Sequence, residues 1–134
     1  MFLLDTNIIS DLVRNPAGFA AQRIELVGES SIATSVVVAG ELRYGCAKKG
    51  SNKLTDRVEA ILAEMEVRPV PPGAARIYGA IRADLERRGV PIGQNDLWIA
   101  AHAMAASATL VTANTDEFCR VESLITVNWV ESSL

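Results

Sequence analysis

Histidine and cysteine are scarce in this chain of 134 residues. Its only histidine is His102, and its two cysteines, Cys46 and Cys119, lie far apart in the sequence and form no CxxC pair. A zinc site built from clustered histidine and cysteine ligands is therefore not expected. The two thiols neither require nor exclude a disulfide, and the cytoplasm is the default expectation for location.

Long apolar runs, a large net charge and targeting signals are also missing. No apolar stretch reaches the roughly 20 residues of a membrane-spanning helix, so we expect no membrane partner. The N-terminus has neither the basic region nor the cleavage site of a signal peptide. The net charge of −3 argues against nonspecific coating of nucleic acid. Apolar residues make up 49% of the chain, which is enough for a core, and we expect a single domain over residues 1–134.

Apolar runs alternate with helical patterns along the whole chain, without repeats or a long linker. The expected strands are Met1–Leu4, Ser31–Thr34, Val67–Val70, Thr109–Thr112 and Ile125–Val130. The expected helices are Thr6–Arg14, Ala17–Gly28, Ser35–Lys48, Asn52–Glu66, Ala74–Arg88 and Asn95–Ala106. This alternation predicts an α/β fold with a parallel sheet covered by helices on both faces.

Four acidic residues stand at or beside apolar segments, where a charge needs compensation. Asp5 directly follows the first strand, Glu41 lies in an apolar helix, Asp96 opens a helix with almost no polar face, and Asp116 follows the fourth strand. In open parallel sheets, ligands bind beyond the carboxyl ends of the strands. Carboxylate oxygens suit Mg²⁺ or Mn²⁺. The pattern therefore indicates a divalent-metal site.

Each acid also has a structural explanation. Glu41 can pair with Arg43 or Lys48, and an acid at a helix start, such as Asp96, commonly caps the helix or interacts with its dipole. At the fourth strand, Asp116 or Asn114 could be a ligand, or Asp116 could cap a short helix. The sequence alone leaves these alternatives open.

Other catalytic groups are not apparent. His102 lies six residues after Asp96 and so on a different face of the helix. No serine fits a nucleophile elbow, and no glycine-rich P-loop occurs. Catalysis by these acids would need a metal that lowers the pKa of a bound water.

These motifs together resemble the VapC toxins of the PIN-domain ribonuclease superfamily. They are Asp5-Thr6-Asn7 at the N-terminus, Glu41 in its apolar helix, Asn95–Ala101, and the segment 110–118 that contains Asn114 and Asp116. The resemblance covers nearly the whole chain in the right order. It implies a three-layer α/β/α sandwich with a central, mostly parallel sheet, and an Mg²⁺- or Mn²⁺-dependent endoribonuclease. It further implies a cognate VapB-like antitoxin, and it suggests tRNA as the RNA substrate.

The resemblance carries the metal and catalytic roles to Asp5, Glu41 and Asp96, with Asp116 as the choice for the fourth acid. Asp5 and Asp96 should hold the metal directly, while Glu41 and Asp116 hold its waters or a second ion. Substrate-orienting roles are assigned to Thr6, Asn7, Arg82, Thr112 and Asn114. The helix Ser35–Lys48 is expected to flank the antitoxin groove. We also expect a homodimer, because alanine-rich and valine-rich faces must be covered.

Two other classes of protein compete with this interpretation. One is a phosphotransfer or phosphatase-type α/β domain, but the second aspartate that such phosphatases need is replaced by Asn7, and the late lysine of receiver domains is absent after Lys53. The other is a non-catalytic binding protein whose acids only form ion pairs. Metal-dependent cleavage of RNA separates these classes.

Overall fold

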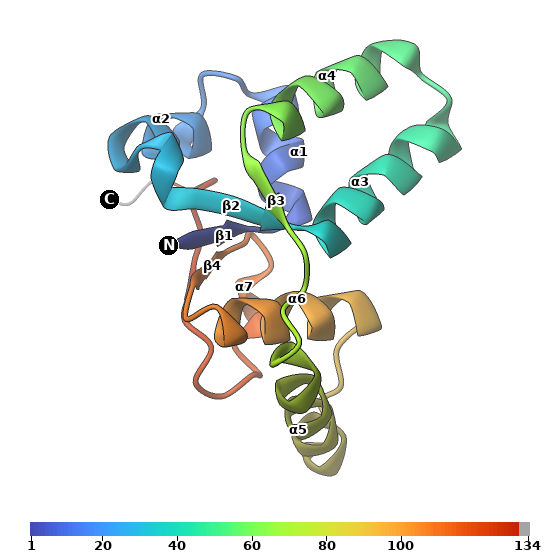
Figure 1. The fold of residues 1–134 in the computed structure, drawn as a ribbon, viewed down its shortest axis with the longest axis vertical. Helices are drawn as coiled ribbons and strands as arrows, with labels where there is room; N and C mark the ends of the chain where they lie inside the picture. Colours follow the sequence, from blue (N-terminus) through green and yellow to red (C-terminus); the bar gives the residue numbers. More distant parts are fainter. Residues whose placement is uncertain (132–134) are drawn as a thin grey trace.

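Five short strands form one all-parallel sheet in the computed structural model, which describes residues 1–131 (Figure 1). The strands are β1 (Phe2–Leu4), β2 (Ile32–Ser35), β3 (Glu66–Arg68), β4 (Thr109–Val111) and β5 (Thr126–Val127). Their order is β3-β2-β1-β4-β5, which places β1 at the centre. Leu4 is in register with Thr34 on one side and Val111 on the other.

Helices cover both faces of this sheet. They are α1 (Thr6–Arg14), α2 (Phe19–Val27), α3 (Val36–Lys49), α4 (Asn52–Ala63), α5 (Ala74–Arg88), α6 (Gln94–Ala105) and α7 (Thr115–Phe118), with a 3-10 turn at Glu29–Ser31. Figure 1 shows α1 to α4 above the sheet and α5 and α6 below it. The expected three-layer α/β/α sandwich with a parallel sheet is thus confirmed.

The central strands lie in the core because both of their faces are covered. Leu4, Leu110 and Val111 are fully buried, as are Ile99 and Ala100 on α6. Burial on both faces explains why these strands read as continuous apolar runs. Each fully buried Leu or Ile contributes roughly 1.5–3 kcal/mol relative to an exposed one. This core fixes the strand ends that carry the site.

The boundaries of α1 and α5 agree with the sequence prediction, but several others differ. The third strand ends at Arg68 instead of Val70, because Pro69 has no N–H for the ladder. The fifth strand is only Thr126–Val127, and α4 ends at Ala63, before the expected Glu66. The four-residue helix α7 was not predicted as an element, since one turn has no readable periodicity.

The carboxyl edge of the sheet brings polar residues into one row. Asp5 and Thr112 directly follow the paired residues Leu4 and Val111, and Ser35 pairs with Arg68 at the neighbouring position. The chain adds β2 and β3 on one side of β1, and β4 and β5 on the other. Asp5 therefore lies at the topological switch point, where open α/β sheets form their ligand crevice.

Among residues 1–131, no helix is both long enough and apolar enough to span a membrane.

Candidate active site

Asp5 is held rigidly at the centre of the carboxyl edge. Its side chain is only 3% exposed, and its Oδ1 accepts a hydrogen bond from the backbone N–H of Thr6 at 2.8 Å. Its Oδ2 accepts from the Thr112 hydroxyl at 2.8 Å and from the Asn7 amide at 3.2 Å. Asp5 is also the residue that caps the N-terminus of α1. The sharp change from strand to helix therefore fixes the position of this carboxylate.

The pKa of Asp5 is raised above its ordinary value. Burial is the main cause, and the negative charge of Glu41 adds to it. Hydrogen bonds from Thr112, Thr6 and Asn7 act in the opposite direction, because they stabilise the ionised carboxylate. Three donors thus offset part of the effect that burial has on the pKa of this carboxylate.

Glu41 joins the same cluster through α1. Its Oε1 accepts a hydrogen bond from the Thr6 hydroxyl at 2.8 Å, so Thr6 contacts both acids. The alternative ion pair with Arg43 does not form, since Arg43 binds Glu59 at 2.9 Å. Glu41 is half-buried, and the helix that carries it begins at the Ser35 cap.

Asp96 lies in the first turn of α6 and is close enough to the other acids to be affected by them. The cap position is Gly93, so neither Asp96 nor Asn95 caps this helix. Burial raises the pKa of Asp96 to about 7, helped by the charge of Glu117 and a hydrogen bond to it, and then by the charges of Asp5 and Glu41. The Asp96 carboxylate therefore takes up a proton more readily than an ordinary aspartate does.

Glu117, on α7, is the fourth acid that the structure places beside Asp96. Its carboxylate accepts hydrogen bonds from the backbone N–H of Gly93, at 3.3 Å, and from the side-chain amide of Asn114. Asp116, the expected fourth acid, is exposed, and within residues 1–131 its carboxylate makes no hydrogen bond or ion pair.

A signal for Glu117 was present in the sequence. Phe118 is fully buried and anchors α7. At about 100° per residue, Asp116 lies about 200° from Phe118, toward solvent, whereas Glu117 lies only about 100° away. An apolar residue directly after two acids thus indicates which acid faces the protein. This phase argument requires knowing that the segment is helical.

The polar residues assigned to substrate orientation mostly bind the acids. Asn7 bridges two segments, because its amide nitrogen donates to Asp5 and its Oδ1 accepts from the Ala113 N–H at 2.9 Å. The Thr112 hydroxyl donates to Asp5 and accepts from the Asn114 N–H at 2.9 Å. Thr6, Asn7, Thr112 and Asn114 therefore form a hydrogen-bonded frame around the carboxylates.

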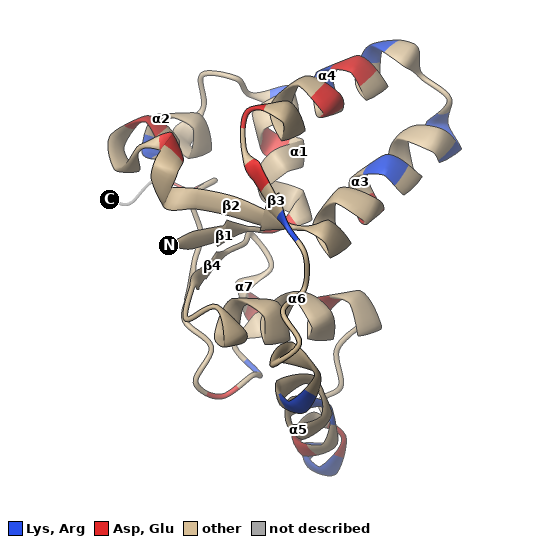
Figure 2. Cartoon of the chain, in the orientation of Figure 1, with Lys and Arg blue, Asp and Glu red and all other residues tan. Residues whose placement is uncertain are grey.

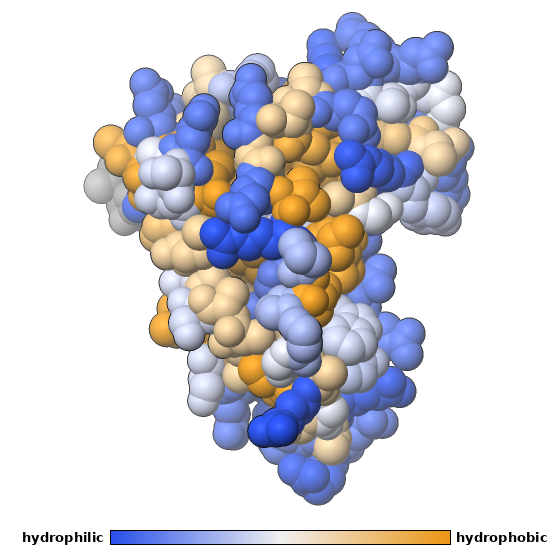
Figure 3. Space-filling model, in the orientation of Figure 1, coloured by the Kyte–Doolittle hydropathy of each residue, from blue (hydrophilic) through white to orange (hydrophobic). Residues whose placement is uncertain are grey.

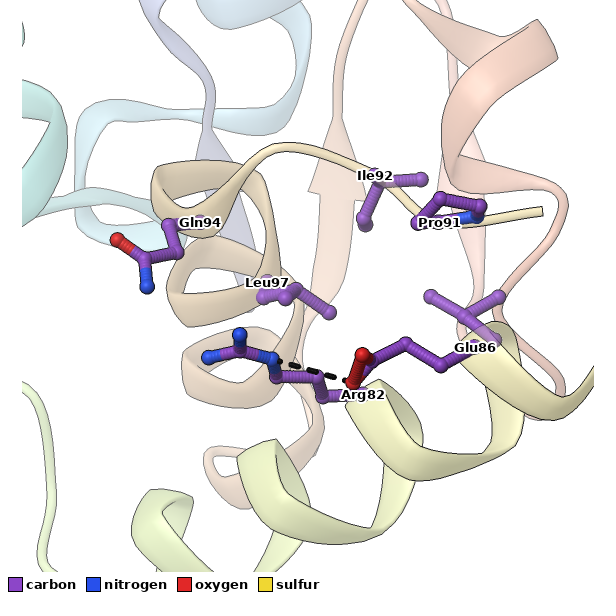
Figure 4. A pocket seen from close by; sticks show the side chains of 7 residues that line it. Arg82, Glu86, Pro91, Ile92, Gln94 and Leu97 are labelled. Carbon is purple, nitrogen blue, oxygen red and sulfur yellow. Dashed lines mark ion pairs between the residues drawn. The ribbon is translucent and has the colours of Figure 1, made fainter. Parts of the chain in front are cut away.

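Arg82 lies apart from this frame, along a cavity of about 100 Å³ between α5 and α6 (Figure 4). Its guanidinium donates to the Tyr78 hydroxyl at 2.9 Å and forms an ion pair with Glu86 at 3.4 Å. Gln94, from the first turn of α6, lines the same cavity. The remaining charges on the far end of α5 are of both signs (Figure 2), and Arg88 there binds Asp84. Arg82 thus faces the start of the helix that carries Asp96.

The four acids interact electrostatically without forming a closed ligand shell. Within the described part of the chain, no three side chains of the His, Cys, Asp or Glu types are gathered closely enough to ligate one ion as they stand. The donor set nevertheless consists of carboxylate oxygens, which oxygen-preferring divalent cations require. The raised pKa of Asp96 means that negative charge is unfavourable at this place, and a bound cation would relieve the repulsion.

A carboxylate cluster at the switch point of a parallel α/β sheet defines a class of fold and site, and comparison with known proteins specifies it. The family model for the PIN domain matches residues 2–124. Ribonuclease VapC2 of Rickettsia felis is 37% identical over 131 residues, which is 96% of this chain and 98% of that protein. The tRNA(fMet)-specific endonuclease VapC of Shigella flexneri is 35% identical, over 96% of this chain and 97% of the relative.

The fold agrees with these sequence matches. The crystal structure of VapBC2 from Rickettsia felis bound to a DNA fragment from their promoter aligns with a TM-score of 0.88 and 36% identity, over 96% of this chain and 98% of that one. The chain belongs to the PIN-domain family, among its VapC ribonucleases. Ribonucleases of this family generally depend on a divalent metal.

Proposed function

We propose that Asp5, Glu41, Asp96 and Glu117 form the catalytic site of this ribonuclease and hold a divalent cation, Mg²⁺ or Mn²⁺. The observation that supports this most directly is the placement of Thr6, which contacts both Asp5 and Glu41 at 2.8 Å. Burial and the charges of Glu117, Asp5 and Glu41 raise the pKa of Asp96 to about 7, in agreement with this placement. The four acids come from separate elements, and the charges of Asp5, Glu41 and Glu117 all act on Asp96. Asp116 remains the competing candidate for the fourth position.

The cation and the chain have separate tasks in this proposal. Asp5 and Asp96 would hold the cation, with Glu41 and Glu117 beside it. A bound divalent cation activates water for attack on the phosphodiester and offsets the negative charge that grows on the phosphate oxygens.

The surrounding residues keep the carboxylates in place. Thr112 and Asn7 fix Asp5, Thr6 holds Glu41, and the Gly93 N–H and the Asn114 amide hold Glu117. Such preorganisation matters because small displacements of catalytic groups reduce rates strongly. In this proposal the main role of four polar residues is to hold the acids, and contact with RNA comes second; they are Thr6, Asn7, Thr112 and Asn114. Arg82 is the remaining candidate for a phosphate contact.

The reaction is the internal hydrolysis of RNA, and we propose a tRNA as the substrate. Two relatives, from Shigella flexneri and Salmonella typhimurium, carry the name tRNA(fMet)-specific endonuclease. The sequence matches to both cover 96% of this chain. Initiator tRNA is therefore the first substrate to test. The phosphotransfer alternative has no support in these comparisons.

The partners follow from the solved relatives. In three of them a VapC toxin is crystallised with its VapB antitoxin. We propose that this chain is likewise the toxin of a toxin-antitoxin pair and is silenced by a VapB-like protein. We keep the cytoplasm as its proposed location, because Cys46 and Cys119 are both free.

We also propose that the chain forms a homodimer. Val36 and Tyr44 on α3 are 48% and 66% exposed, and Figure 3 shows apolar atoms on the surface where α3 begins and the chain leaves β3. Val37, which follows Val36 on α3, lines an open apolar hollow together with Val70, Pro71 and Pro72. Sedimentation equilibrium of the wild type and of Val36→Asp tests this, with a monomeric wild type as the contrary result.

The central experiment measures RNA cleavage by the purified chain. Initiator and elongator methionine tRNAs are incubated with chelator, Mg²⁺ or Mn²⁺, using wild-type protein and Asp5→Asn. We expect cleavage only with a divalent ion and only by the wild type. Cleavage that persists in chelator, or that Asp5→Asn retains, would reject the proposed site. Equal cleavage of all tRNAs would reject only the choice of substrate.

A further inference from the structure

The only histidine forms a buried hydrogen bond outside the acid cluster. His102 lies in the last turn of α6 and is 1% exposed. Its Nδ1 is 2.9 Å from the Oγ of Ser35, which is itself completely buried. A buried polar pair of this kind must be fully satisfied to be tolerated.

Ser35 connects this histidine to the start of α3. It is the last residue of β2 and the N-cap of α3, where its Oγ accepts the Val37 N–H at 3.2 Å. Burial, with a smaller effect from the charge of Arg68, lowers the pKa of His102, which favours the neutral ring. A neutral ring can accept a hydrogen bond from the Ser35 hydroxyl at Nδ1, which leaves the hydroxyl oxygen free to accept the Val37 N–H at the cap.

The two helices joined by this bond carry two acids of the site. Glu41 follows Ser35 by six residues on α3, and Asp96 precedes His102 by six residues on α6. The helices α3 and α6 also pack against each other. Glu41 is also linked to Asp5 through Thr6, so the position of α3 relative to α6 affects the distances between the acids.

We infer that His102 is a positioning residue for the acid cluster: through Ser35 it fixes the N-terminus of α3, and with it Glu41, relative to Asp96. The inference rests on the proposed function, because the cluster must bind a cation for this position to matter. Residues that hold metal ligands in place typically affect metal affinity or activity about 10–100-fold. A simple core-filling role for His102 would change stability only.

Two substitutions at this position separate the two roles. His102→Leu fills similar space without a polar atom, whereas His102→Asn keeps an amide near the place of Nδ1. Positioning predicts that Asn restores function better than Leu, and core filling predicts the reverse. If His102 acts through Ser35, adding His102→Leu to Ser35→Ala should cause little further loss.

The experiment compares Mn²⁺ affinity by calorimetry and single-turnover RNA cleavage at saturating Mn²⁺ in the full chain, well below each melting temperature. Leu62→Ala on α4 is the control, because Leu62 is a buried core residue outside the His102–Ser35 pair. We expect His102→Leu to lower Mn²⁺ affinity about 10–100-fold relative to the control, and His102→Asn to restore most of it. Should His102→Leu not fold, His102→Gln, whose amide lies near the place of Nε2, replaces it.

The outcomes distinguish this inference from the proposed function. Wild-type protein that neither binds Mn²⁺ nor cleaves RNA would defeat the proposed function and the inference together. Active wild type with a His102→Leu variant that matches Leu62→Ala in both measurements would overturn the inference alone. Fully additive losses in Ser35→Ala and His102→Leu would also overturn it.

Discussion

Asp5 is a buried carboxylate in the candidate site, so burial disfavours the charge that metal binding requires. An ionised carboxylate removed from water is costly, and here three donors compensate part of that cost. The charge of Glu41 raises this cost again. A proton on Asp96 or a cation among the carboxylates would relieve the repulsion between the acids. Proton and metal therefore compete for the same negative charge.

This competition predicts how stability depends on pH. The pKa of Asp96 is raised from 3.8 in its ordinary state to about 7 in the folded protein, so the folded state binds the proton more tightly. The resulting stabilisation is fully present below pH 3.8 and is lost as pH rises through about 7. Asp96→Asn lacks this loss, because an amide does not ionise.

Melting curves in chelator, from pH 5 to pH 8, measure this effect. We expect the melting temperature of Asp96→Asn to exceed that of the wild type by an amount that grows with pH. Added Mn²⁺ should reduce the difference, since it binds only to the ionised cluster. A difference that is constant across this pH range would show that Asp96 titrates at its ordinary pKa.

A second residue-level prediction concerns the identity of the fourth acid. Glu117→Gln keeps the size of the side chain but removes the charge that acts on Asp96. It should lower RNA cleavage at least tenfold at limiting Mn²⁺, in line with the usual effect of residues around metal ligands. Asp116→Asn, one residue away and exposed, is the matched control and should retain wild-type cleavage. The opposite ranking of the two variants would restore Asp116 as the fourth acid.

At the scale of elements, the sequence predicts best where a helix is long and clearly bounded. The bounds of α1 and α5 follow from periodicity and, for α5, from Gly89, which has a φ of 71°. Asp5, Glu41 and Asp96 were chosen as candidates because each interrupts an apolar segment. Glu117 was not chosen, because α7 has one turn and two adjacent acids. The role of Ser35 and His102 depends on a contact between residues 67 apart, which no local pattern reports.

The end of β4 gives a prediction at this scale. The Thr112 hydroxyl joins three segments, since it donates to Asp5, which follows β1, and accepts from the Asn114 N–H before α7. Thr112→Val keeps the shape but leaves both groups without this partner. Chemical denaturation should show a loss of about 1–3 kcal/mol in the free energy of unfolding. Thr112→Ser, which keeps the hydroxyl, should lose much less, and equal losses would mean that the methyl group matters and the hydroxyl does not.

At the scale of the whole molecule, a groove of about 360 Å³ lies beside the site, between α1, α3 and α4. Thr6 and Glu41 line one part of it, Leu42, Cys46 and Val58 give it an apolar lining, and Arg14 and Lys49 supply positive charge. An apolar antitoxin segment could lie here with its end directed to the acids. On α3, Leu42 lines this groove, whereas Val36 and Tyr44 are exposed and are not part of its lining, and the flank expected on this helix stays a prediction.

Gly45 offers a direct test of that arrangement. It lies on α3 and lines the groove, and a Cβ at this position meets nothing within 4 Å. Gly45→Trp should therefore fold, fill the groove and keep RNA cleavage, but lose inhibition by the proposed VapB-like antitoxin by tenfold or more. Gly79→Trp is the control, since Gly79 is equally unobstructed but lies on α5, away from the groove. Cleavage is measured against increasing antitoxin for both variants and the wild type, and equal inhibition of Gly45→Trp and Gly79→Trp would place the antitoxin elsewhere on the molecule.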